Sequence, residues 1–166
     1  MTTTRTLVVM RHGKSSWKTN DPDIARPLNP RGTRDAVVAG QILAPLGFDL
    51  ALVSPAARAQ QTWQCLQMGG ATAREVRTLD ALYHAWTPQI IAELKGLPAG
   101  AARVLMIGHE PTLSDVILTL TPPSASRSEI EAKFPTSAIA VLTTEHPWDA
   151  LAEDVATLAA YEVPRG

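Results

Sequence analysis

The sequence predicts an α/β fold, a three-layer α/β/α sandwich whose central sheet is mostly parallel with an antiparallel edge strand. Short apolar segments alternate with longer segments of helical periodicity along the 166 residues. Strands of a parallel sheet are buried on both faces and are therefore nearly continuous apolar runs, as at residues 6–11, 50–53 and 103–107. The last strand, residues 156–162, is expected to pair antiparallel at an edge.

The remaining elements follow from local signals in the chain. Ser54 is expected to cap a helix over residues 55–68, with Pro55 at the first helical position, where a missing N–H costs nothing. Gly47 is expected to end the first helix. The Pro- and Ser-rich stretch 120–135 is expected to be a mobile loop. The other predicted helices are 30–46, 88–97 and 112–120, and the other predicted strands are 74–78 and 138–143.

Composition narrows the classes of function. Hydrophobic residues make up 45% and charged residues 19% of the chain, as in a folded globular protein. A net charge of −1 gives no electrostatic basis for binding nucleic acid or an anionic membrane. Cys65 is the single cysteine, which excludes an internal disulfide and a cysteine-based metal site. The N-terminus is expected to lead directly into a strand, with no signal peptide. A cytoplasmic monomer is expected.

Polar residues with catalytic potential follow three of the predicted strands. Arg11-His12-Gly13 follows the first strand, Arg58 lies in the first turn of the helix after the second, and His109 follows the fourth. Taken alone, each has an ordinary interpretation: a glycine turn, a solvated arginine and a structural histidine. Ligands bind at the carboxyl ends of strands in such sheets, and arginine beside histidine favours an anion, most simply a phosphate. Together the three positions indicate a phosphate site.

Five stretches of the chain, in order, resemble the histidine phosphatase, or phosphoglycerate-mutase-like, superfamily. They also resemble, within it, the small SixA-type phosphohistidine phosphatases. The stretches are LVVMRHGKSSW (7–17), RPLNPRG (26–32), VSPAARAQQT (53–62), VLMIGHEPTL (104–113) and TSAIA (136–140). The resemblance covers most of the chain and implies one domain, residues 1–166, with the fold of that superfamily. The chain is too short for the large cap insertions of phosphoglycerate mutases, so an open, shallow pocket is expected.

The resemblance assigns roles by position. His12 matches the nucleophile that becomes phosphorylated, and Arg11 and Arg58 match the two arginines that clamp the phosphate. His109 matches the second pocket histidine, which helps to bind the transferring phosphoryl group. Residues expected to bind substrate around the pocket mouth are Lys14, Ser15, Ser16, Trp17 and Arg26.

Two of the peripheral residues have a structural alternative, of equal weight for Arg26 and of at least equal weight for Ser137. Arg26, in the segment Arg-Pro-Leu-Asn-Pro, either adds positive charge at the rim or fixes the start of the next helix. Ser137 either reaches the pocket or begins a strand.

Phosphoryl transfer to a histidine is mostly a matter of positioning and electrostatic stabilisation. Neutral imidazole has a free lone pair near pH 7, so His12 should donate one ring N–H to a backbone carbonyl and attack through the other nitrogen. A protonated His109 would donate to a phosphate oxygen or to the leaving group. Because the cationic side chains take the part of a metal, neither a metal nor another cofactor is expected.

One position departs from the superfamily pattern. Many relatives place a glutamate, the general acid, where this chain has Ala81, and the nearby candidates for a proton donor are Asp80, His84, Glu110 and His109. A phosphohistidine substrate needs a strong acid less than a phosphoester does, because imidazole leaves more easily than an alkoxide. The expected partner is therefore a protein carrying phosphohistidine. The alternatives are a small phosphoester, hydrolysed by a broad phosphomonoesterase, and a phosphate-binding module without turnover.

Overall fold

The central sheet has six strands in the order β3-β2-β4-β1-β5-β6. The structure, a computed structural model, describes residues 3–166. Neighbours among β3, β2, β4 and β1 are parallel, whereas β5 is antiparallel to both β1 and β6. The final strand therefore lies at an edge and pairs antiparallel, as expected, but the strand that reverses direction is β5. The strands are β1 (Arg5–Arg11), β2 (Phe48–Val53), β3 (Ala73–Thr78), β4 (Arg103–Gly108), β5 (Ile139–Thr144) and β6 (Thr157–Glu162).

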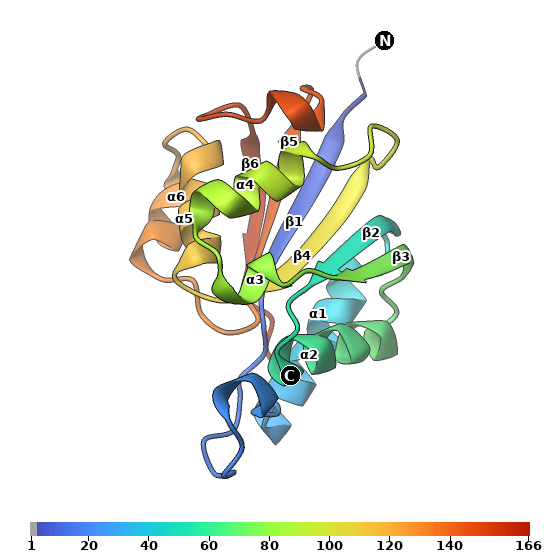
Figure 1. Ribbon diagram of the computed structural model, residues 1–166, viewed down its shortest axis with the longest axis vertical. Coiled ribbons are helices and arrows are strands. Elements are labelled where there is room, and N and C mark those ends of the chain that lie inside the picture. The colour runs from blue at the N-terminus through green and yellow to red at the C-terminus, as the bar shows by residue number, and fades with distance from the viewer. Residues whose placement is uncertain (1–2) are drawn as a thin grey trace.

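Helices cover both faces of this sheet, which confirms the three-layer architecture. Helices α1 and α2 pack on one face, and α4, α5 and α6 lie on the other (Figure 1). The helices are α1 (Pro30–Leu43), α2 (Ala57–Gly69), α3 (Ala81–His84), α4 (Thr87–Lys95), α5 (Thr112–Leu120) and α6 (Ala125–Ala132), with short 3-10 helices at η1 (Asp23–Ala25) and η2 (Trp148–Ala150).

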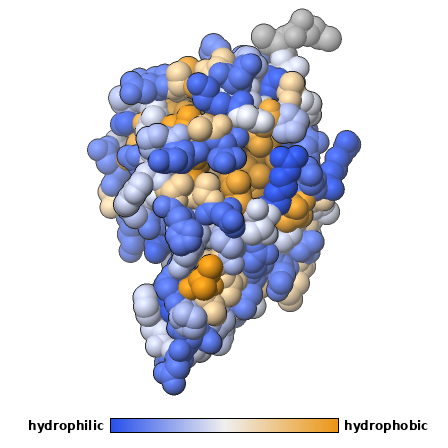
Figure 2. Space-filling model, in the orientation of Figure 1, coloured by the Kyte–Doolittle hydropathy of each residue, from blue (hydrophilic) through white to orange (hydrophobic). Residues whose placement is uncertain are grey.

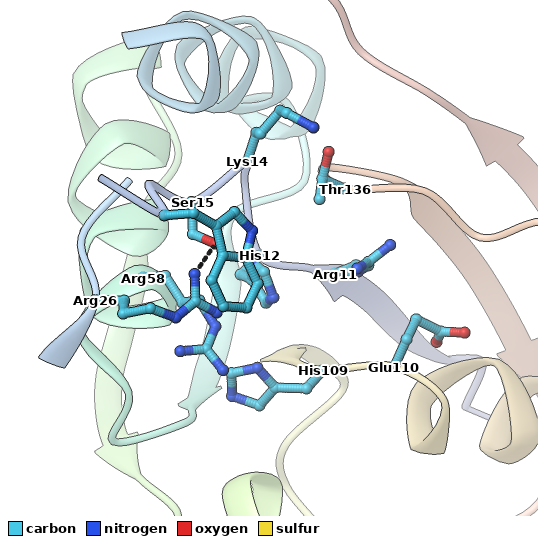
Figure 3. A pocket seen from close by; sticks show the side chains of 10 residues that line it. Arg11, His12, Lys14, Ser15, Arg26, Arg58, His109, Glu110 and Thr136 are labelled. Carbon is cyan, nitrogen blue, oxygen red and sulfur yellow. Dashed lines mark hydrogen bonds between the residues drawn. The ribbon is translucent and has the colours of Figure 1, made fainter. Parts of the chain in front are cut away.

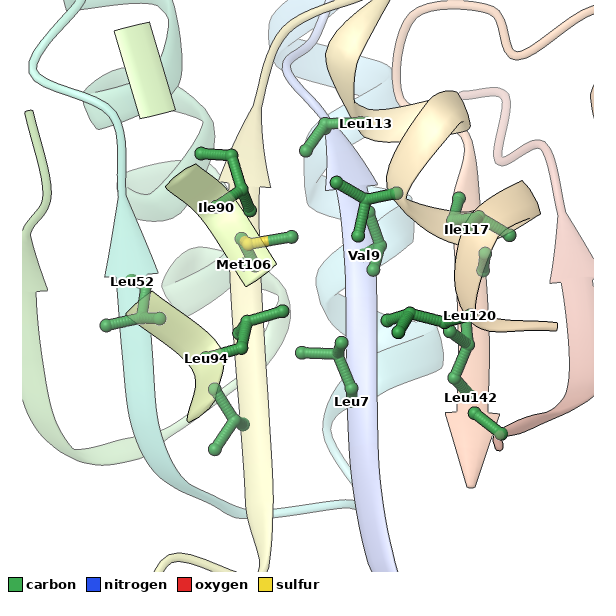
Figure 4. Packing of buried hydrophobic residues seen from close by; sticks show 14 of the residues in the cluster. Leu7, Val9, Leu52, Ile90, Leu94, Met106, Leu113, Ile117, Leu120 and Leu142 are labelled. Atoms are coloured by element: carbon green, nitrogen blue, oxygen red, sulfur yellow. The ribbon is translucent and has the colours of Figure 1, made fainter. Parts of the chain in front are cut away.

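Alternation along the buried strands divides the core into two layers. On β1, Leu7 and Val9 face the cluster formed with α4 and α5, whereas Val8 and Met10 face the cluster formed with α1 and α2. Figure 4 shows the first of these clusters, with Leu113 of α5 beside β1 and β4. Each fully buried aliphatic side chain contributes roughly 1.5–3 kcal/mol, so the core holds the ends of β1 and β4 at a fixed level.

Helices α1 and α2 approach each other closely through glycine. A Cβ atom added to Gly40 of α1 would lie 2.2 Å from the carbonyl oxygen of Leu66 in α2, a distance that no side chain tolerates. The two helix backbones therefore touch here, and this contact fixes the position of α2 and of Arg58 near its start.

Two predictions about local structure were wrong. Helix α2 begins at Ala57, and Ser54 is not its N-cap. The Ser54 hydroxyl accepts a hydrogen bond from the Ala56 N–H at 3.2 Å, and it also bonds a ring nitrogen of His109, so it belongs to the turn before the helix. The stretch 120–135 contains helix α6, which is capped by Ser124 and anchored by the buried side chain of Ile130.

Other boundaries moved by a few residues. Helix α1 ends at Leu43, and a turn leads to Gly47, whose positive φ of 56° suits glycine. Helix α4 covers Thr87–Lys95, and the additional short helix α3 precedes it. Helix α5 has the predicted bounds. Within residues 3–166, no helix combines the length and the apolar character needed to span a membrane.

Candidate active site

The two pocket histidines follow neighbouring parallel strands at the same level. Arg11, the last residue of β1, is in register with Gly108, the last residue of β4. The backbone N–H of His12 donates to the carbonyl of Gly108 at 3.1 Å. This hydrogen bond extends the pairing of β1 with β4 by one residue beyond the end of β1. The His12 and His109 rings consequently lie with their centroids 5.0 Å apart and their planes inclined by 52°.

A cavity of about 250 Å³ opens at this end of the sheet. Most of the predicted site residues line it, together with Thr136, which sequence reasoning missed, and Glu110, which it named only as a proton donor. In Figure 3, Arg11 and Arg58 lie on opposite sides of His12. The lining residues are Arg11, His12, Lys14, Ser15, Trp17, Arg26, Arg58, His109, Glu110 and Thr136.

The His12 ring is fixed by its own loop. Nδ1 lies 2.6 Å from the carbonyl oxygen of Gly13, and because a carbonyl only accepts, Nδ1 must carry the proton. Burial lowers the pKa of His12 to about 3 despite this hydrogen bond. The ring is therefore neutral at physiological pH, and Nε2 carries a free lone pair, as predicted for a nucleophile.

His109 is held by the turn before α2. Its Nε2 atom is 2.7 Å from Oγ of Ser54, and its Nδ1 atom is buried without a partner. Burial, followed by the positive charge of Arg58, lowers the pKa of His109 to about 4. His109 is therefore neutral near pH 7, and the protonated donor that the sequence left open is not the form present there. If the Ser54 hydroxyl donates to Nε2, the proton of the neutral ring lies on Nδ1 and is available to an anion.

Arg58 is paired with Asp23, a residue that the sequence did not single out. The Nη2 atom of Arg58 lies 3.1 Å from Oδ2 of Asp23, and Nη1 donates to the Asp23 backbone carbonyl at 2.8 Å. The hydroxyl of Tyr83 donates to the same carboxylate at 2.7 Å. These hydrogen bonds, with that of Tyr83 strongest, lower the pKa of Asp23 to about 2. Asp23 is three residues before Arg26 in a polar loop. This spacing of opposite charges was the one sequence signal that could have pointed to Asp23.

Arg26 lines the cavity, as one of the two sequence interpretations expects, and its hydrogen bonds go to the β1–α1 loop and not to the start of α1. Its Nη1 atom donates to Oγ of Ser15 at 2.8 Å and to the carbonyl of Ser16 at 3.1 Å, and its Nε atom donates to Asp23 at 3.2 Å. The guanidinium also lies 3.6 Å from the ring centroid of Trp17. Arg26 therefore fixes the loop after β1 while it lines the cavity.

Several predicted residues lie elsewhere. Ser16 does not line the cavity, and its side chain accepts from the Lys18 backbone. Asp80 and His84 are exposed and also lie outside the cavity. Ser137 is buried before β5 with a positive φ of 65°, and its N–H donates to the His12 carbonyl at 3.0 Å, so it supports the nucleophile loop from behind.

Glu110 reaches the cavity, but its carboxylate is already engaged by α5. It accepts hydrogen bonds from the backbone N–H of Ser114 at 2.8 Å and from the hydroxyl of the same residue. These contacts place its negative charge at the helix N-terminus, where it satisfies a free backbone donor.

The cavity has unused capacity to donate hydrogen bonds. Three buried side-chain nitrogens at the site have no partner within residues 3–166: Nε of Arg11, Nε of Arg58 and Nδ1 of His109. Buried donors without partners are costly, and a multivalent anion would satisfy them. Within the described residues, no three His, Cys, Asp or Glu side chains are grouped as they would be to hold a metal ion. The arrangement is suited to bind a phosphoryl group between two arginines and two neutral histidines.

Comparison with known proteins identifies the class. The family model of the histidine phosphatase superfamily (branch 1) matches residues 7–85. An uncharacterized protein of Mycobacterium leprae is 39% identical over 165 residues, which cover 94% of this chain and all of that protein.

Solved structures extend the likeness over the whole chain. A protein of Nakamurella multipartitia provisionally assigned as phosphohistidine phosphatase SixA is 33% identical, with a TM-score of 0.83 over 97% of this chain and 96% of that one. The protein histidine phosphatase SixA in complex with tungstate is 25% identical, with a TM-score of 0.80 over 96% of this chain and 97% of that one.

The chain belongs to the histidine phosphatase superfamily and is a phosphatase with the fold of that superfamily. Among solved structures, its neighbours include the SixA phosphohistidine phosphatases, which it matches over nearly its full length.

Proposed function

We propose that this phosphatase hydrolyses phosphohistidine in proteins through a covalent phosphoryl intermediate on His12, with no metal required. The observation that carries the proposal is the hydrogen bond from Nδ1 of His12 to the carbonyl of Gly13. It selects the tautomer with a lone pair on Nε2, and the lowered pKa of His12 keeps that lone pair free at neutral pH.

The phosphoryl group is bound by the side chains around His12. Arg11 and Arg58 supply permanent positive charge on either side of the nucleophile, and His109 supplies a buried ring nitrogen. Preorganised cationic donors stabilise the charge that spreads over the three equatorial oxygens in phosphoryl transfer. The SixA structure with tungstate supports this assignment, because tungstate is an oxyanion with the tetrahedral shape of phosphate.

The reaction proceeds in two displacements. In the first, the Nε2 lone pair of His12 forms a bond to phosphorus while the bond from phosphorus to the substrate imidazole breaks, and the departing imidazole takes a proton from water. In the second, water attacks the phosphorus of phospho-His12, the bond to Nε2 breaks, and inorganic phosphate leaves with the remaining proton passing to solvent. His12 returns to its neutral form.

The substrate class follows from the lack of a free carboxylic acid among the described residues that line the cavity, where the carboxylate of Glu110 is already engaged by Ser114. By the resemblance to the superfamily, Ala81 takes the position of its glutamate, and Asp80 does not line the cavity. Asp23 is close to Arg58, but a pKa of about 2 keeps it ionised at neutral pH. A leaving group that departs without strong protonation fits such a pocket, which favours the P–N bond of phosphohistidine over the P–O bond of a phosphoester.

The geometry of the pocket also bears on its partner. The short turn that contains His109 and Glu110 borders it, and the described residues include no large cap over it. A pocket of about 250 Å³ with an open mouth admits a phosphorylated side chain on a protein surface. We infer one phosphatase domain over residues 1–166 that acts as a monomer in the cytoplasm, with no further cofactor.

The test is intact-protein mass spectrometry after mixing with phosphoramidate, a small compound with a P–N bond, and quenching without acid. We expect a phosphoryl adduct that maps to His12 and decays with release of inorganic phosphate. The variant His12→Ala should lose the adduct and lower phosphate release by about a thousandfold or more while keeping its melting temperature. His146→Ala, which removes an exposed histidine outside the cavity, is the matched control.

Two results would overturn the proposal. An adduct on another residue, or phosphate release that survives His12→Ala, would exclude His12 as the nucleophile. A kcat/KM higher for phosphomonoesters than for histidine-phosphorylated protein would retain the nucleophile and replace the substrate class.

A further inference from the structure

A second hollow, here named the basic groove, runs alongside the active-site cavity. It has a volume of about 500 Å³ and shares Lys14, Ser15 and Trp17 with that cavity. Its other lining residues come from the beginning and the end of the β1–α1 loop and from the start of α1. Because the two hollows share a wall, a polypeptide whose phosphorylated side chain enters the cavity has its neighbouring residues at the groove.

Backbone hydrogen bonds hold the floor of the groove in a fixed shape. The two segments that form it, 14–18 and 27–31, are joined by an isolated antiparallel bridge between Ser15 and Leu28. Two backbone hydrogen bonds flank this bridge, from the Ser16 N–H to the Pro27 carbonyl at 2.8 Å and from the Asn29 N–H to the Lys14 carbonyl at 2.9 Å. The groove therefore keeps its shape without a partner, and binding costs little ordering of the backbone.

Trp17 stands at the junction of the two hollows. Its side chain is 79% exposed, while its ring lies on the guanidinium of Arg26 at 3.6 Å. A large indole that is held in place and still open to solvent is the type of side chain that carries most of the energy at protein interfaces. Pro27, Leu28 and Pro30 add apolar surface to the groove beside it.

The charged side chains that line the groove are all positive. It contains three cationic side chains, Lys14, Lys18 and Arg31, and within the described residues no Asp or Glu lines it. The ammonium groups of Lys14 and Lys18 form no salt bridge inside residues 3–166, whereas Arg31 lies 3.6 Å from Asp35. The whole chain has a net charge of −1, so this positive charge is a local concentration. Figure 2 shows the corresponding lower end of the molecule as mainly hydrophilic.

We propose that the basic groove binds an acidic segment of the phosphorylated substrate protein, next to the residue that is dephosphorylated. This inference rests on the proposed function and names the feature of the substrate that the enzyme recognises. Carboxylates of the segment pair with Lys18 and Arg31, and an apolar side chain of the segment packs on the exposed face of Trp17. Such rim pairs raise the rate of encounter and set the choice of substrate more than they add affinity.

The experiment compares three substrates that differ only around the phosphorylated site. The first is a histidine-phosphorylated peptide flanked by Asp and Glu, the second is the same peptide with Asn and Gln, and the third is phosphoramidate. The enzyme should hydrolyse the acidic peptide with the highest kcat/KM. This preference should fall as salt rises from about 50 to about 300 mM, because dissolved ions screen charges at the surface. The expected preference is about five- to tenfold at low salt.

Lys18→Glu tests the groove without touching the cavity. It should lower kcat/KM for the acidic peptide about five- to tenfold, through KM, and leave phosphoramidate hydrolysis unchanged. Arg31→Gln should act in the same direction and more weakly. Lys95→Glu, at the end of α4 and outside both hollows, is the matched control.

A binding measurement separates this proposal from the proposed function. Anisotropy of a dye-labelled, unphosphorylated acidic peptide should show binding that Lys18→Glu weakens. If no P–N substrate is hydrolysed but this binding persists, the proposed function fails and the groove assignment stands. If both peptides are hydrolysed equally, or if Lys18→Glu slows phosphoramidate as much as the acidic peptide, the groove assignment is wrong and the phosphatase assignment stands.

Discussion

Asp23 forms an ion pair with Arg58, which lines the active-site cavity, with Nη2 and Oδ2 3.1 Å apart. The pair joins η1 in the β1–α1 loop to the first turn of α2, and Tyr83 adds a hydrogen bond from the segment after β3. Arg58 is 6% exposed, so its guanidinium is fixed before any substrate arrives. The exposed loop residue Asp23 therefore helps to hold the buried guanidinium of Arg58 in place.

Asp23→Asn should destabilise the protein in a pH-dependent way. Because the folded pKa of Asp23 is lowered from 3.8 to about 2, its stabilisation is complete above the unfolded value of 3.8 and is lost as pH falls through about 2. The carboxylate is half exposed, which limits the effect to roughly 1 kcal/mol at pH 6. Urea unfolding of both proteins at pH 6, 4 and 3 measures it, and a difference that grows toward low pH would contradict the prediction.

The two pocket histidines should titrate far below free imidazole. Burial lowers the pKa of His12 from 6.5 to about 3 and that of His109 to about 4. The unfolded chain therefore binds these protons first, so stability should fall as pH drops below 6.5 and continue to fall toward the folded values. Carbon-detected NMR of the imidazole rings checks this, with His12→Ala and His109→Ala assigning the signals. A measured pKa near 6.5 for either ring would contradict the prediction.

Ser54→Ala should lower kcat and leave the fold intact. The Ser54 hydroxyl is 2.7 Å from Nε2 of His109, and its loss frees the ring to rotate and to change tautomer. One neutral hydrogen bond is worth about 0.5–1.5 kcal/mol, which corresponds to a decrease of roughly two- to tenfold. Steady-state hydrolysis of phosphoramidate measures the decrease, with Ser16→Ala as the control outside the cavity. Equal rates for the two variants would show that Ser54 does not position His109.

Gly32→Ala should disturb the nucleophile loop. A Cβ atom at Gly32 would lie 2.1 Å from the carbonyl oxygen of Lys14, so the loop after His12 and the start of α1 must separate. Overpacking of this kind costs about 1–3 kcal/mol, and we expect a lower melting temperature together with reduced activity. Gly100→Ala, where a Cβ atom meets nothing within 4 Å, is the control. A Gly32→Ala protein with wild-type stability would show that the loop yields without cost.

The sequence predicts most of the fold because its signals are local. The apolar runs of β1, β2 and β4 identify buried parallel strands, and Pro111 and Pro122 bracket α5 so closely that its bounds are predicted correctly. The direction of β5 is not predictable in this way, since an apolar strand has the same pattern in either direction. Helix α6 was missed because its surface is polar and Ile130 is its one buried residue.

The candidate site divides in the same manner. Arg11, His12 and His109 are found from sequence because each stands at a strand end, and parallel strands bring their ends to one edge. The partners of Arg58 and His109 are not found, because Asp23 and Arg58 are 35 residues apart, Ser54 and His109 are 55 apart, and the loops between them carry no periodic pattern. Ser16 was predicted at the pocket mouth on its proximity to His12, and it lines the adjoining basic groove and not the cavity itself.

Strand β1 is paired on both sides, by β4 and by β5, and Val8–Met10 are fully buried between the two core layers. Opening this strand requires disruption of the whole sheet, so its amide hydrogens should exchange with solvent only as fast as the molecule unfolds globally. Of the exposed residues that follow, 18–22 have few such constraints. The nucleophile and the surface proposed to choose its substrates are thus neighbours in the chain with very different tolerance of mutation, and recognition can diverge while the chemistry is preserved.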